Sequence, residues 1–357
     1  MKNLFVCHSQ AQLILAIGLA KGRFGEQTNN LILFKDFFMG EELKRNLNEI
    51  FNTVYIRKGG YPKQNKKWKK KGYRFISDLI FLKKTLISFY NKVFIICDQN
   101  LQELYIIKKT YILNIKTEFI WLEDGSYPYF LNIENKQGLN RNRFTVHVRQ
   151  FIFKYFLQFG SIYSYEGNYM AGNKHLKTAY LTMPECARDI FKNKKLIKIE
   201  AKEYLIGIKS FFSNQKNIFF PEGDIIIVFD KFDTYEYLDQ IKDICSYVIK
   251  VSKQKGKNVL FKLHPREEVA NLEFLENAKE LNRNFGFEFY ISRIVESNST
   301  IKVIGFKSTS LQVAKFFDLE TISLFLLSGE SNKELCDFYK KLNISLLKNI
   351  EKLEASI

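Results

Sequence analysis

The sequence lacks the patterns that would mark a disulfide-bonded or metal-binding protein. Its five cysteines stand singly, an odd number with no Cys-x-x-Cys pair, so neither a disulfide framework nor a zinc site is predicted. A reducing compartment is favoured. The four histidines form no His-x-x-x-His pair, and no Asp-x-Asp occurs in the chain. We therefore expect no metal site built from protein side chains.

Long apolar runs are also missing. The apolar segment near the start, Leu13–Ala20, is far shorter than the about 20 residues that a membrane-spanning helix needs. The first residues show no pattern typical of a signal peptide. We therefore expect a cytoplasmic protein.

Acidic residues are scarce relative to basic ones. The chain has 55 Lys and Arg against 38 Asp and Glu, a formal net charge of +17. Such an excess favours an anionic partner: nucleic acid, nucleotide, acidic glycan or the inner leaflet of a membrane. Two basic stretches, Lys63–Lys71 and Arg141–Lys154, could bind phosphate or anionic lipid, but a solvated loop and packing against a sheet explain them as well.

Short apolar runs alternate with helical patterns along the chain. The first half alternates in this way from Leu4–Cys7 to Glu118–Leu122, and the second half from Leu196–Ile199 to Ile322–Phe325. Apolar strands that alternate with helices are typical of parallel sheets covered by helices on both faces. The sequence therefore predicts an α/β protein.

A length of 357 residues predicts two domains, at roughly 150 residues for each. The polar, glycine-rich stretch from Gly160 to Thr178 is the predicted connection, which gives domains over residues 1–165 and 175–357. Within the second domain, the pattern predicts a helix over Leu272–Asn282 and a strand at Phe287–Tyr290.

Polar side chains follow three of the predicted strands. Glu123-Asp124-Gly125 ends the last strand of the first half, and each carboxylate raises the proton affinity of the other, so one of them could act as a base. Gly125 permits a turn that other residues disfavour. A plain polar turn is the alternative interpretation.

In the second half, the strand Val259–Leu263 stops at His264-Pro265, where the proline keeps His264 in an extended backbone. Further on, Ser308-Thr309-Ser310 opens a helix whose N-terminus could bind phosphate, although these hydroxyls could equally be an ordinary helix cap. Ligands of open α/β sheets bind at the carboxyl ends of the strands, where these residues are predicted to lie.

Together, Glu123-Asp124-Gly125, His264-Pro265 and Ser308-Thr309-Ser310 resemble the three motifs of bacterial sialyltransferases with the GT-B fold. The likeness is to capsule polysialyltransferases and lipooligosaccharide sialyltransferases, and the opening Phe5–Leu13 is similar to the start of the latter. The resemblance implies two Rossmann-like domains facing a cleft. It also implies inverting transfer of sialic acid from CMP-sialic acid to a glycan hydroxyl in capsule or lipooligosaccharide synthesis, with no cofactor or metal.

The resemblance assigns roles by matching motif positions. Asp124 would take the proton of the acceptor hydroxyl, with Glu123 supporting it or exchanging roles with it. His264, held by Pro265, would meet the departing CMP phosphate. Gly305 would let the loop approach the donor, and the donor phosphate would be held by Ser308, Thr309 and Ser310. Thr309 stands where the family often has a tyrosine.

The implied partners are a nucleotide-sugar donor, an anionic or lipid-linked glycan acceptor and the anionic inner face of the plasma membrane, with no nucleic acid. Three alternatives stay open. The first is a GT-B transferase that uses CMP-Kdo or a nucleoside diphosphate sugar, and the second is a polyol-phosphate transferase of the teichoic-acid type. The third is a basic nucleic-acid-binding protein, for which no module signature appears.

Overall fold

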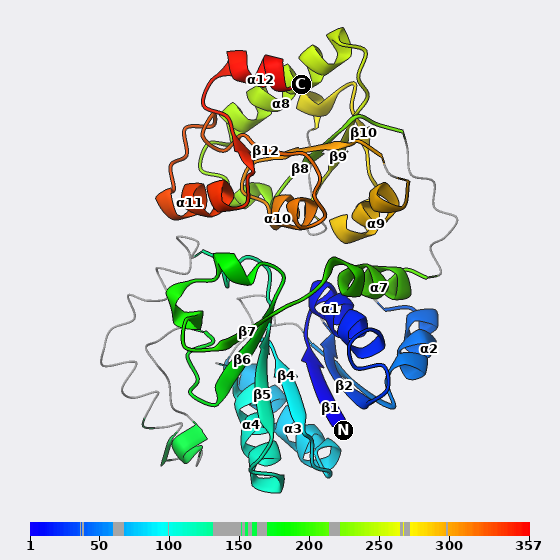
Figure 1. Ribbon diagram of the computed structural model, residues 1–357, viewed down its shortest axis with the longest axis vertical. Helices are drawn as coiled ribbons and strands as arrows, with labels where there is room; N and C mark the ends of the chain where they lie inside the picture. Colours follow the sequence, from blue (N-terminus) through cyan, green and yellow to red (C-terminus); the bar gives the residue numbers. More distant parts are fainter. Residues whose placement is uncertain are drawn as a thin grey trace. The chain divides into compact units, whose positions relative to one another are not determined.

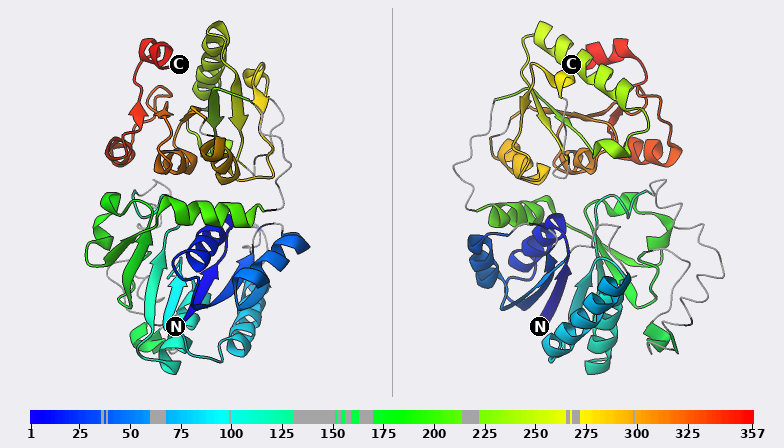
Figure 2. Two further views of the ribbon diagram at one scale, coloured as in Figure 1. Left: turned by 45° about the vertical axis from the view of Figure 1, so that its right-hand side comes forward. Right: turned by 180° about the vertical axis from the view of Figure 1, so that it is seen from behind.

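The computed structural model describes residues 1–35, 37, 39–59, 68–98, 100–130, 151, 154–155, 159–162, 170–213, 222–264, 267, 272–297 and 299–357. The chain divides into two compact units, Met1–Ser213 and Asn214–Ile357 (Figures 1 and 2). Each unit is a parallel β-sheet with helices on both faces, so the predicted α/β architecture is confirmed.

The first unit is built on a seven-stranded sheet with the order β3-β2-β1-β4-β5-β6-β7, in which all recorded strand pairs are parallel. Phe5 of β1 stacks on Phe94 of β4 with ring centroids 4.4 Å apart, and Trp121 of β5 is fully buried. The strands are β1 (Lys2–Cys7), β2 (Thr28–Lys35), β3 (Thr53–Lys58), β4 (Lys92–Ile95), β5 (Glu118–Leu122), β6 (Leu176–Leu181) and β7 (Lys195–Lys198).

Helices cover both faces of this sheet. On one face α1 (Gln10–Lys21), α2 (Glu41–Ile50) and α7 (Ala201–Phe211) pack against one another, and on the other α3 (Trp68–Thr85) packs against α4 (Leu101–Leu113) (Figure 2). Three short 3-10 helices complete the described part of the unit: η2 (Gly160–Ile162), η3 (Pro184–Cys186) and η4 (Asp189–Phe191).

Helices α1 and α7 touch at backbone level. A Cβ atom added to Gly207 would lie 2.1 Å from the carbonyl oxygen of Ile14, and one added to Gly18 would lie 2.1 Å from that of Glu203. Arg23, just past α1, forms an ion pair with Glu203 at 2.8 Å. Glycine is needed at both positions because no side chain fits between the two helices.

The boundary between the units lies later in the chain than predicted. Residues 160–178 were expected to connect two domains, but β6 and β7 extend the first sheet and α7 packs on α1, so the first unit runs to Ser213. The strand predicted at Leu196–Ile199 exists as β7. It belongs to the first sheet, because it pairs with β6 in register from Thr178 with Lys195 to Leu181 with Lys198.

The second unit has a six-stranded parallel sheet with the order β10-β9-β8-β11-β12-β13. Helices α9 and α10 contact each other, as do α8 and α12 (Figure 1). Its strands are β8 (Ile225–Val228), β9 (Val259–Lys262), β10 (Lys279–Glu280), β11 (Lys302–Gly305), β12 (Thr321–Ser323) and β13 (Ser345–Leu346). Its helices are η5 (Phe232–Thr234), α8 (Leu238–Gln254), η6 (Glu273–Leu275), α9 (Phe287–Ser297), α10 (Thr309–Phe316), α11 (Lys333–Lys341) and α12 (Ile350–Ser356).

Two element predictions in this unit are wrong. The segment predicted as a helix over Leu272–Asn282 holds η6 and the short strand β10, which pairs with β9. The segment predicted as a strand at Phe287–Tyr290 begins α9. Phe287, Tyr290, Ile291 and Ile294 are all buried, and this spacing continues a helical period that the first four residues alone disguise as alternation.

None of the helices in the described residues is long and apolar enough to cross a membrane.

The close contact between α1 and α7 leads us to expect that a side chain added at Gly207 destabilises the first unit. Gly207→Ala should lower the free energy of unfolding of the first unit by about 1–3 kcal/mol, because the new methyl group meets a backbone carbonyl that cannot move aside. Urea unfolding followed by tryptophan fluorescence measures this, since both tryptophans, Trp68 and Trp121, lie in the first unit. Gly40→Ala is the control, since its Cβ would meet nothing within 4 Å. Equal stability of the two variants would contradict the close packing.

Candidate active site

The carboxyl edge of the first sheet gathers polar side chains from three neighbouring strands. His8 follows β1, Asp98 follows β4, and Glu123 and Asp124 follow β5, and these strands are adjacent in the order β1-β4-β5. Parallel pairing therefore brings residues more than a hundred positions apart to one edge. This edge is where open α/β sheets bind ligands.

Gln12 links the first and last of these strand ends. Its Oε1 accepts the backbone N–H groups of His8 at 2.7 Å and Ser9 at 2.9 Å, while its Nε2 donates to Asp124 Oδ1 at 2.8 Å. Ser9 caps α1 and accepts from the Gln12 backbone N–H, so Gln12 is part of a capping box. The start of α1 thus fixes the position of the Asp124 carboxylate.

His8 lies beside a buried carboxylate. Its Nε2 is 2.5 Å from Oε1 of Glu103, which is in the first turn of α4 and fully buried, whereas the His8 side chain is 27% exposed. The imidazole also stacks on Phe34 with ring centroids 5.1 Å apart. A carboxylate and an aromatic ring together hold the imidazole in one orientation at the sheet edge.

Glu123 points into the protein, unlike its neighbour. Its Oε2 accepts from Tyr129 Oη at 2.5 Å and from the backbone N–H of Thr182, and its Oε1 is 2.9 Å from Thr182 Oγ1. Burial is the largest cause that raises the pKa of Glu123 to about 7, and the charge of Asp124 is a smaller one. The proton affinity foreseen for the carboxylate pair is thus present at Glu123, mainly because of burial.

Asp98 holds the chain that leads into β6. Its carboxylate accepts the backbone N–H groups of Ala171 and Asn173, both at 2.9 Å. Burial raises the pKa of Asp98 to about 6 even though these hydrogen bonds oppose the shift.

Gly125 has φ +53°, the left-handed conformation for which the sequence predicted a glycine.

In the second unit, His264 stands two residues beyond β9 and is half-buried. Its carbonyl oxygen accepts from the Glu267 backbone N–H at 2.9 Å, and Glu267 Oε2 accepts from the Phe232 N–H at 2.6 Å. The segment after β9 is therefore tied to the segment after β8, its neighbour in the sheet. Pro265 lies outside the described residues.

The predicted phosphate-binding helix begins as expected, since Ser308 is the N-cap of α10 and accepts from the Ser310 N–H at 3.3 Å. Ser308 is nearly fully buried and also forms a hydrogen bond with Asp230, which follows β8. Burial raises the pKa of Asp230 to about 6 against the opposing effects of Ser308 and Lys307. The exposed hydroxyl at this helix start is that of Thr309.

Packing within the sheet explains why position 305 is a glycine, which the sequence did not indicate. It ends β11, and an added Cβ would lie 2.8 Å from Val228 Cγ2 and 2.9 Å from the Val228 carbonyl oxygen. Close packing against β8 thus requires glycine here.

In the first unit Glu123 and Asp124 share one strand end, and in the second His264 follows β9 while Ser308, Thr309 and Ser310 follow β11, two strands that are separated in the sheet by β8. Sequence reasoning missed Gln12, Glu103 and Asp230 as site residues. Asp230 carried a usable signal, because it directly follows the apolar run that forms β8. Glu103 lies inside a helical pattern and carried none, and Gln12 carried only its place in the stretch Phe5–Leu13.

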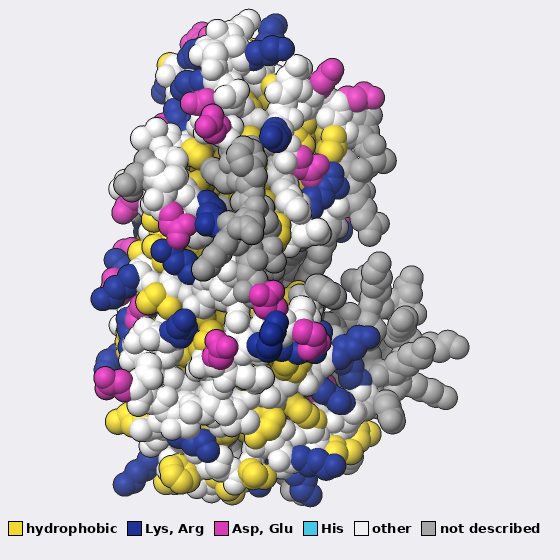
Figure 3. Space-filling model, turned by 90° about the vertical axis from the view of Figure 1, so that its right-hand side faces the viewer, with side chains coloured by type: hydrophobic (Ala, Val, Ile, Leu, Met, Phe, Trp, Pro, Cys, Tyr) yellow, Lys and Arg dark blue, Asp and Glu magenta, His cyan; other side chains and the backbone are white. Residues whose placement is uncertain are grey.

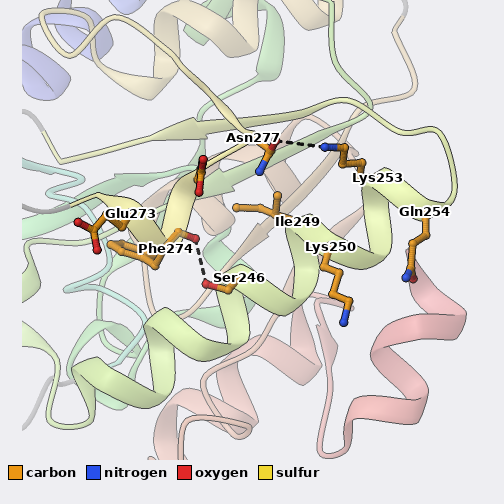
Figure 4. Close-up of a pocket in the computed structure, with 9 residues that line it drawn as sticks. Ser246, Ile249, Lys250, Lys253, Gln254, Glu273, Phe274 and Asn277 are labelled. Atoms are coloured by element: carbon orange, nitrogen blue, oxygen red, sulfur yellow. Dashed lines mark hydrogen bonds between the residues drawn. The ribbon is translucent and has the colours of Figure 1, made fainter.

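Other features lie apart from these strand ends. A hollow of about 520 Å³ is formed by α8 and η6 (Figure 4), where Ser246 Oγ donates to the Phe274 carbonyl at 3.1 Å and Lys253 Nζ to Asn277 at 3.2 Å. It contains none of the predicted site residues. The basic stretches Lys63–Lys71 and Arg141–Lys154 fall mostly outside the described residues.

A protein-family model and several solved structures are similar to this chain. A model of the alpha-2,8-polysialyltransferase family matches residues 44–325, a range that contains all three motifs. No curated protein sequence matches the chain.

Solved structures of three proteins are similar to the fold. UDP-GlcNAc 2-epimerase from Neisseria meningitidis bound to UDP-GlcNAc has a TM-score of 0.58 at 13% identity, with 100% of this chain and 90% of that chain covered. The Methanocaldococcus jannaschii UDP-GlcNAc 2-epimerase has a TM-score of 0.55 at 13% identity, covering 100% and 92%. A UDP-glucosyltransferase from Polygonum tinctorium has a TM-score of 0.49 at 11% identity, covering 94% and 81%. The predicted GT-B fold class is confirmed.

The buried Glu123 predicts a pH dependence of stability. Its folded pKa of about 7 exceeds the about 4.3 of an unfolded chain, so the folded state holds the proton more tightly. Its contribution should be full at low pH and should be lost as pH rises from about 4.3 to about 7, by up to about 1.4 kcal/mol per pH unit.

Glu123→Gln keeps the hydrogen-bonding shape and cannot ionise. As pH rises over this range, the wild type should therefore lose unfolding free energy relative to the variant. Tryptophan-monitored urea unfolding at several pH values measures it. Asp98 and Asp230 titrate equally in both proteins and cancel. A difference independent of pH would show that Glu123 stays ionised.

Proposed function

This chain belongs to the alpha-2,8-polysialyltransferase family, and on that basis we propose that it transfers sialic acid from CMP-sialic acid to a hydroxyl group of a glycan. The transfer proceeds with inversion at the anomeric carbon and requires no cofactor or metal. The observation that carries the proposal is the family match over residues 44–325, which includes every motif that the mechanism uses.

Asp124 is the proposed base. It takes the proton of the acceptor hydroxyl while that oxygen forms a bond to the anomeric carbon, and the bond from the anomeric carbon to the CMP phosphate breaks. Gln12 is a positioning residue, since its amide holds Asp124 Oδ1 at 2.8 Å. Glu123 supports the site from the protein interior, because its carboxylate accepts hydrogen bonds from Thr182 and Tyr129 below the strand end.

His264 serves the leaving group by donating a hydrogen bond to the CMP phosphate as charge develops there. The N-terminus of α10 holds the same phosphate through its backbone N–H groups and the hydroxyls of Thr309 and Ser310. Ser308 acts through the helix, because its hydroxyl is engaged with Asp230 and the Ser310 N–H.

The acceptor is a glycan of capsule or lipooligosaccharide type that carries negative charge. The net charge of +17 supports an anionic acceptor, since it attracts such a chain over long range. Membrane contact through Lys63–Lys71 and Arg141–Lys154 is part of the same proposal.

The test is an incubation of the purified protein with CMP-sialic acid and a panel of lactose and sialyl-lactose acceptors. CMP release that depends on an acceptor is the expected result. Release only from another activated sugar, such as CMP-Kdo or a nucleoside diphosphate sugar, would overturn the choice of donor and leave the fold assignment intact.

The roles of Asp124 and His264 predict different kinetic defects. Asp124→Asn should lower kcat roughly 10²–10⁴-fold with donor binding unchanged, because the shape is kept and the proton acceptor is lost. His264→Ala should lower kcat similarly and also weaken CMP binding, since its phosphate contact exists in the ground state. Steady-state kinetics and CMP titration measure the two effects, and melting temperatures control for folding. Near-normal activity per folded molecule would end either assignment.

The positioning role of Gln12 predicts a loss of rate without a loss of binding. Gln12→Leu should lower kcat about ten-fold or more while the donor KM changes little, because Asp124 loses the amide that orients it. Ser9→Ala is the matched control: it removes the other half of the capping box and costs about 1 kcal/mol of stability without touching Asp124. If both variants lose the same activity, Gln12 acts only through the helix cap.

A further inference from the structure

The amino edge of the first sheet, opposite the edge just described, is a continuous surface built by three turns. These turns precede β4, β5 and β6, which are neighbours in the sheet. Asn114 Nδ2 and Thr117 Oγ1 donate to the Tyr90 carbonyl at 3.1 and 2.8 Å, and the Glu118 N–H donates to the Asn91 carbonyl at 2.9 Å. The turns before β4 and β5 are therefore fixed to each other.

Large apolar side chains are exposed at this end of the first unit. Ile87 is 75% exposed and Ile115 70% exposed, although each stands on a fixed turn. Within the described residues, five of the eleven exposed large apolar side chains lie in the turns before β4 and β5 or at the end of α4: Ile87, Phe89, Ile112, Leu113 and Ile115. Such clustering marks an interaction surface, because exposed apolar residues are otherwise scattered singly.

A basic hollow adjoins these side chains. It measures about 590 Å³ and is lined by Ile115, Lys116, Lys174, His175 and Lys177, among others. One carboxylate, Glu118, also lines it, but Thr178 Oγ1 donates to Glu118 at 2.7 Å and Lys92 lies 3.8 Å from it. The hollow is thus positively charged and opens beside the apolar side chains.

In the sequence, lysines also flank these exposed apolar residues. Residues 83–92 and 108–118 contain Lys83, Lys84, Lys92, Lys108, Lys109 and Lys116, and Glu118 is their sole acidic residue. Figure 3 shows hydrophobic side chains interspersed with Lys and Arg at the lower end of the first unit, the end at which Figure 1 places the N-terminus, α3 and α4.

We propose that this amino-edge surface docks on an anionic lipid bilayer. Ile87, Phe89 and Ile115 insert between headgroups, and Lys116, Lys174 and Lys177 bind a lipid phosphate in the basic hollow. The charge pattern favours this occupant over a second copy of the chain, because a symmetric dimer would bring the same lysines face to face. The surface is distinct from the stretches Lys63–Lys71 and Arg141–Lys154.

Docking at the amino edge would set the distance of the chemistry from the bilayer. Asp124 lies at the other end of β5, whose five residues span about 17 Å at roughly 3.3 Å per residue. The reacting hydroxyl of the acceptor would then be held about a strand length away from the headgroups. The placement of the acceptor rests on the proposed function, whereas the docking itself does not.

Flotation of the full chain with vesicles tests the proposal. Binding to vesicles of equal phosphatidylcholine and phosphatidylglycerol should be at least about ten-fold tighter than to phosphatidylcholine alone. The triple variant Ile87→Ser, Phe89→Ser, Ile115→Ser and the triple variant Lys116→Ser, Lys174→Ser, Lys177→Ser should each weaken binding about ten-fold or more.

The control variant Lys333→Ser, Lys340→Ser, Lys341→Ser removes the same charge from α11 of the second unit and should bind as the wild type does. Because the docking variants leave Asp124 and Gln12 intact, acceptor-dependent CMP release with a soluble acceptor should be unchanged. Loss of docking and failure of the proposed function are therefore distinguishable.

Three outcomes would overturn the proposal. The first is unchanged vesicle binding in both docking variants, with loss of binding only when Lys66, Lys67, Lys69, Lys70 and Lys71 become Ser. The second is equal binding to neutral and anionic vesicles. The third is a loss of vesicle binding in the α11 control variant as large as that in the docking variants, which would show that binding follows net charge and no particular surface.

Discussion

Parallel pairing of β1, β4 and β5 is the constraint on which both ends of the first unit depend. Because the three strands run in the same direction, all their carboxyl ends meet at one edge and all their amino ends at the other. The strands themselves are buried and apolar, so polar side chains can gather only beyond their ends. One edge thus receives His8, Gln12 and Asp124, while the other receives the αβ turns with their exposed isoleucines and lysines.

The same constraint decides what the sequence could predict. Strand ends are visible in a sequence, and the rule that ligands bind there led to Asp124, His264 and Ser308 without any structure. The partners of these residues were not predictable. Gln12 and Asp124 are 112 residues apart, and His8 and Glu103 are 95 apart, so their meeting depends on strand order, which periodicity does not specify.

The division of the chain was harder to predict than its fold class. The glycine-rich segment before β6 resembles a linker locally, yet the contact that determines the boundary is between α1 and α7, which are far apart in sequence. Gly18 and Gly207 each carry part of this contact, and a lone glycine in a helical pattern indicates only a small loss of helix propensity. The two errors in the second unit have the same origin, because pairing with β9 and burial along α9 override the local pattern.

The neighbours Glu123 and Asp124 show how one strand end separates two carboxylates. Successive side chains in an extended segment point to opposite sides, so Glu123 enters the interior while Asp124 meets the amide of Gln12. Burial then favours the protonated form of Glu123, and its proton removes one of two adjacent negative charges.

A similar arrangement exists in the second unit, where Asp230 is held beside the N-terminus of α10 with its pKa raised to about 6. A phosphate bound at that helix would bring a second anion close to Asp230, and two nearby anions raise each other's proton affinity. If a phosphate binds there as proposed, its binding and the protonation of Asp230 would be linked, and the neutral carboxyl group would remain a hydrogen-bond partner of Ser308.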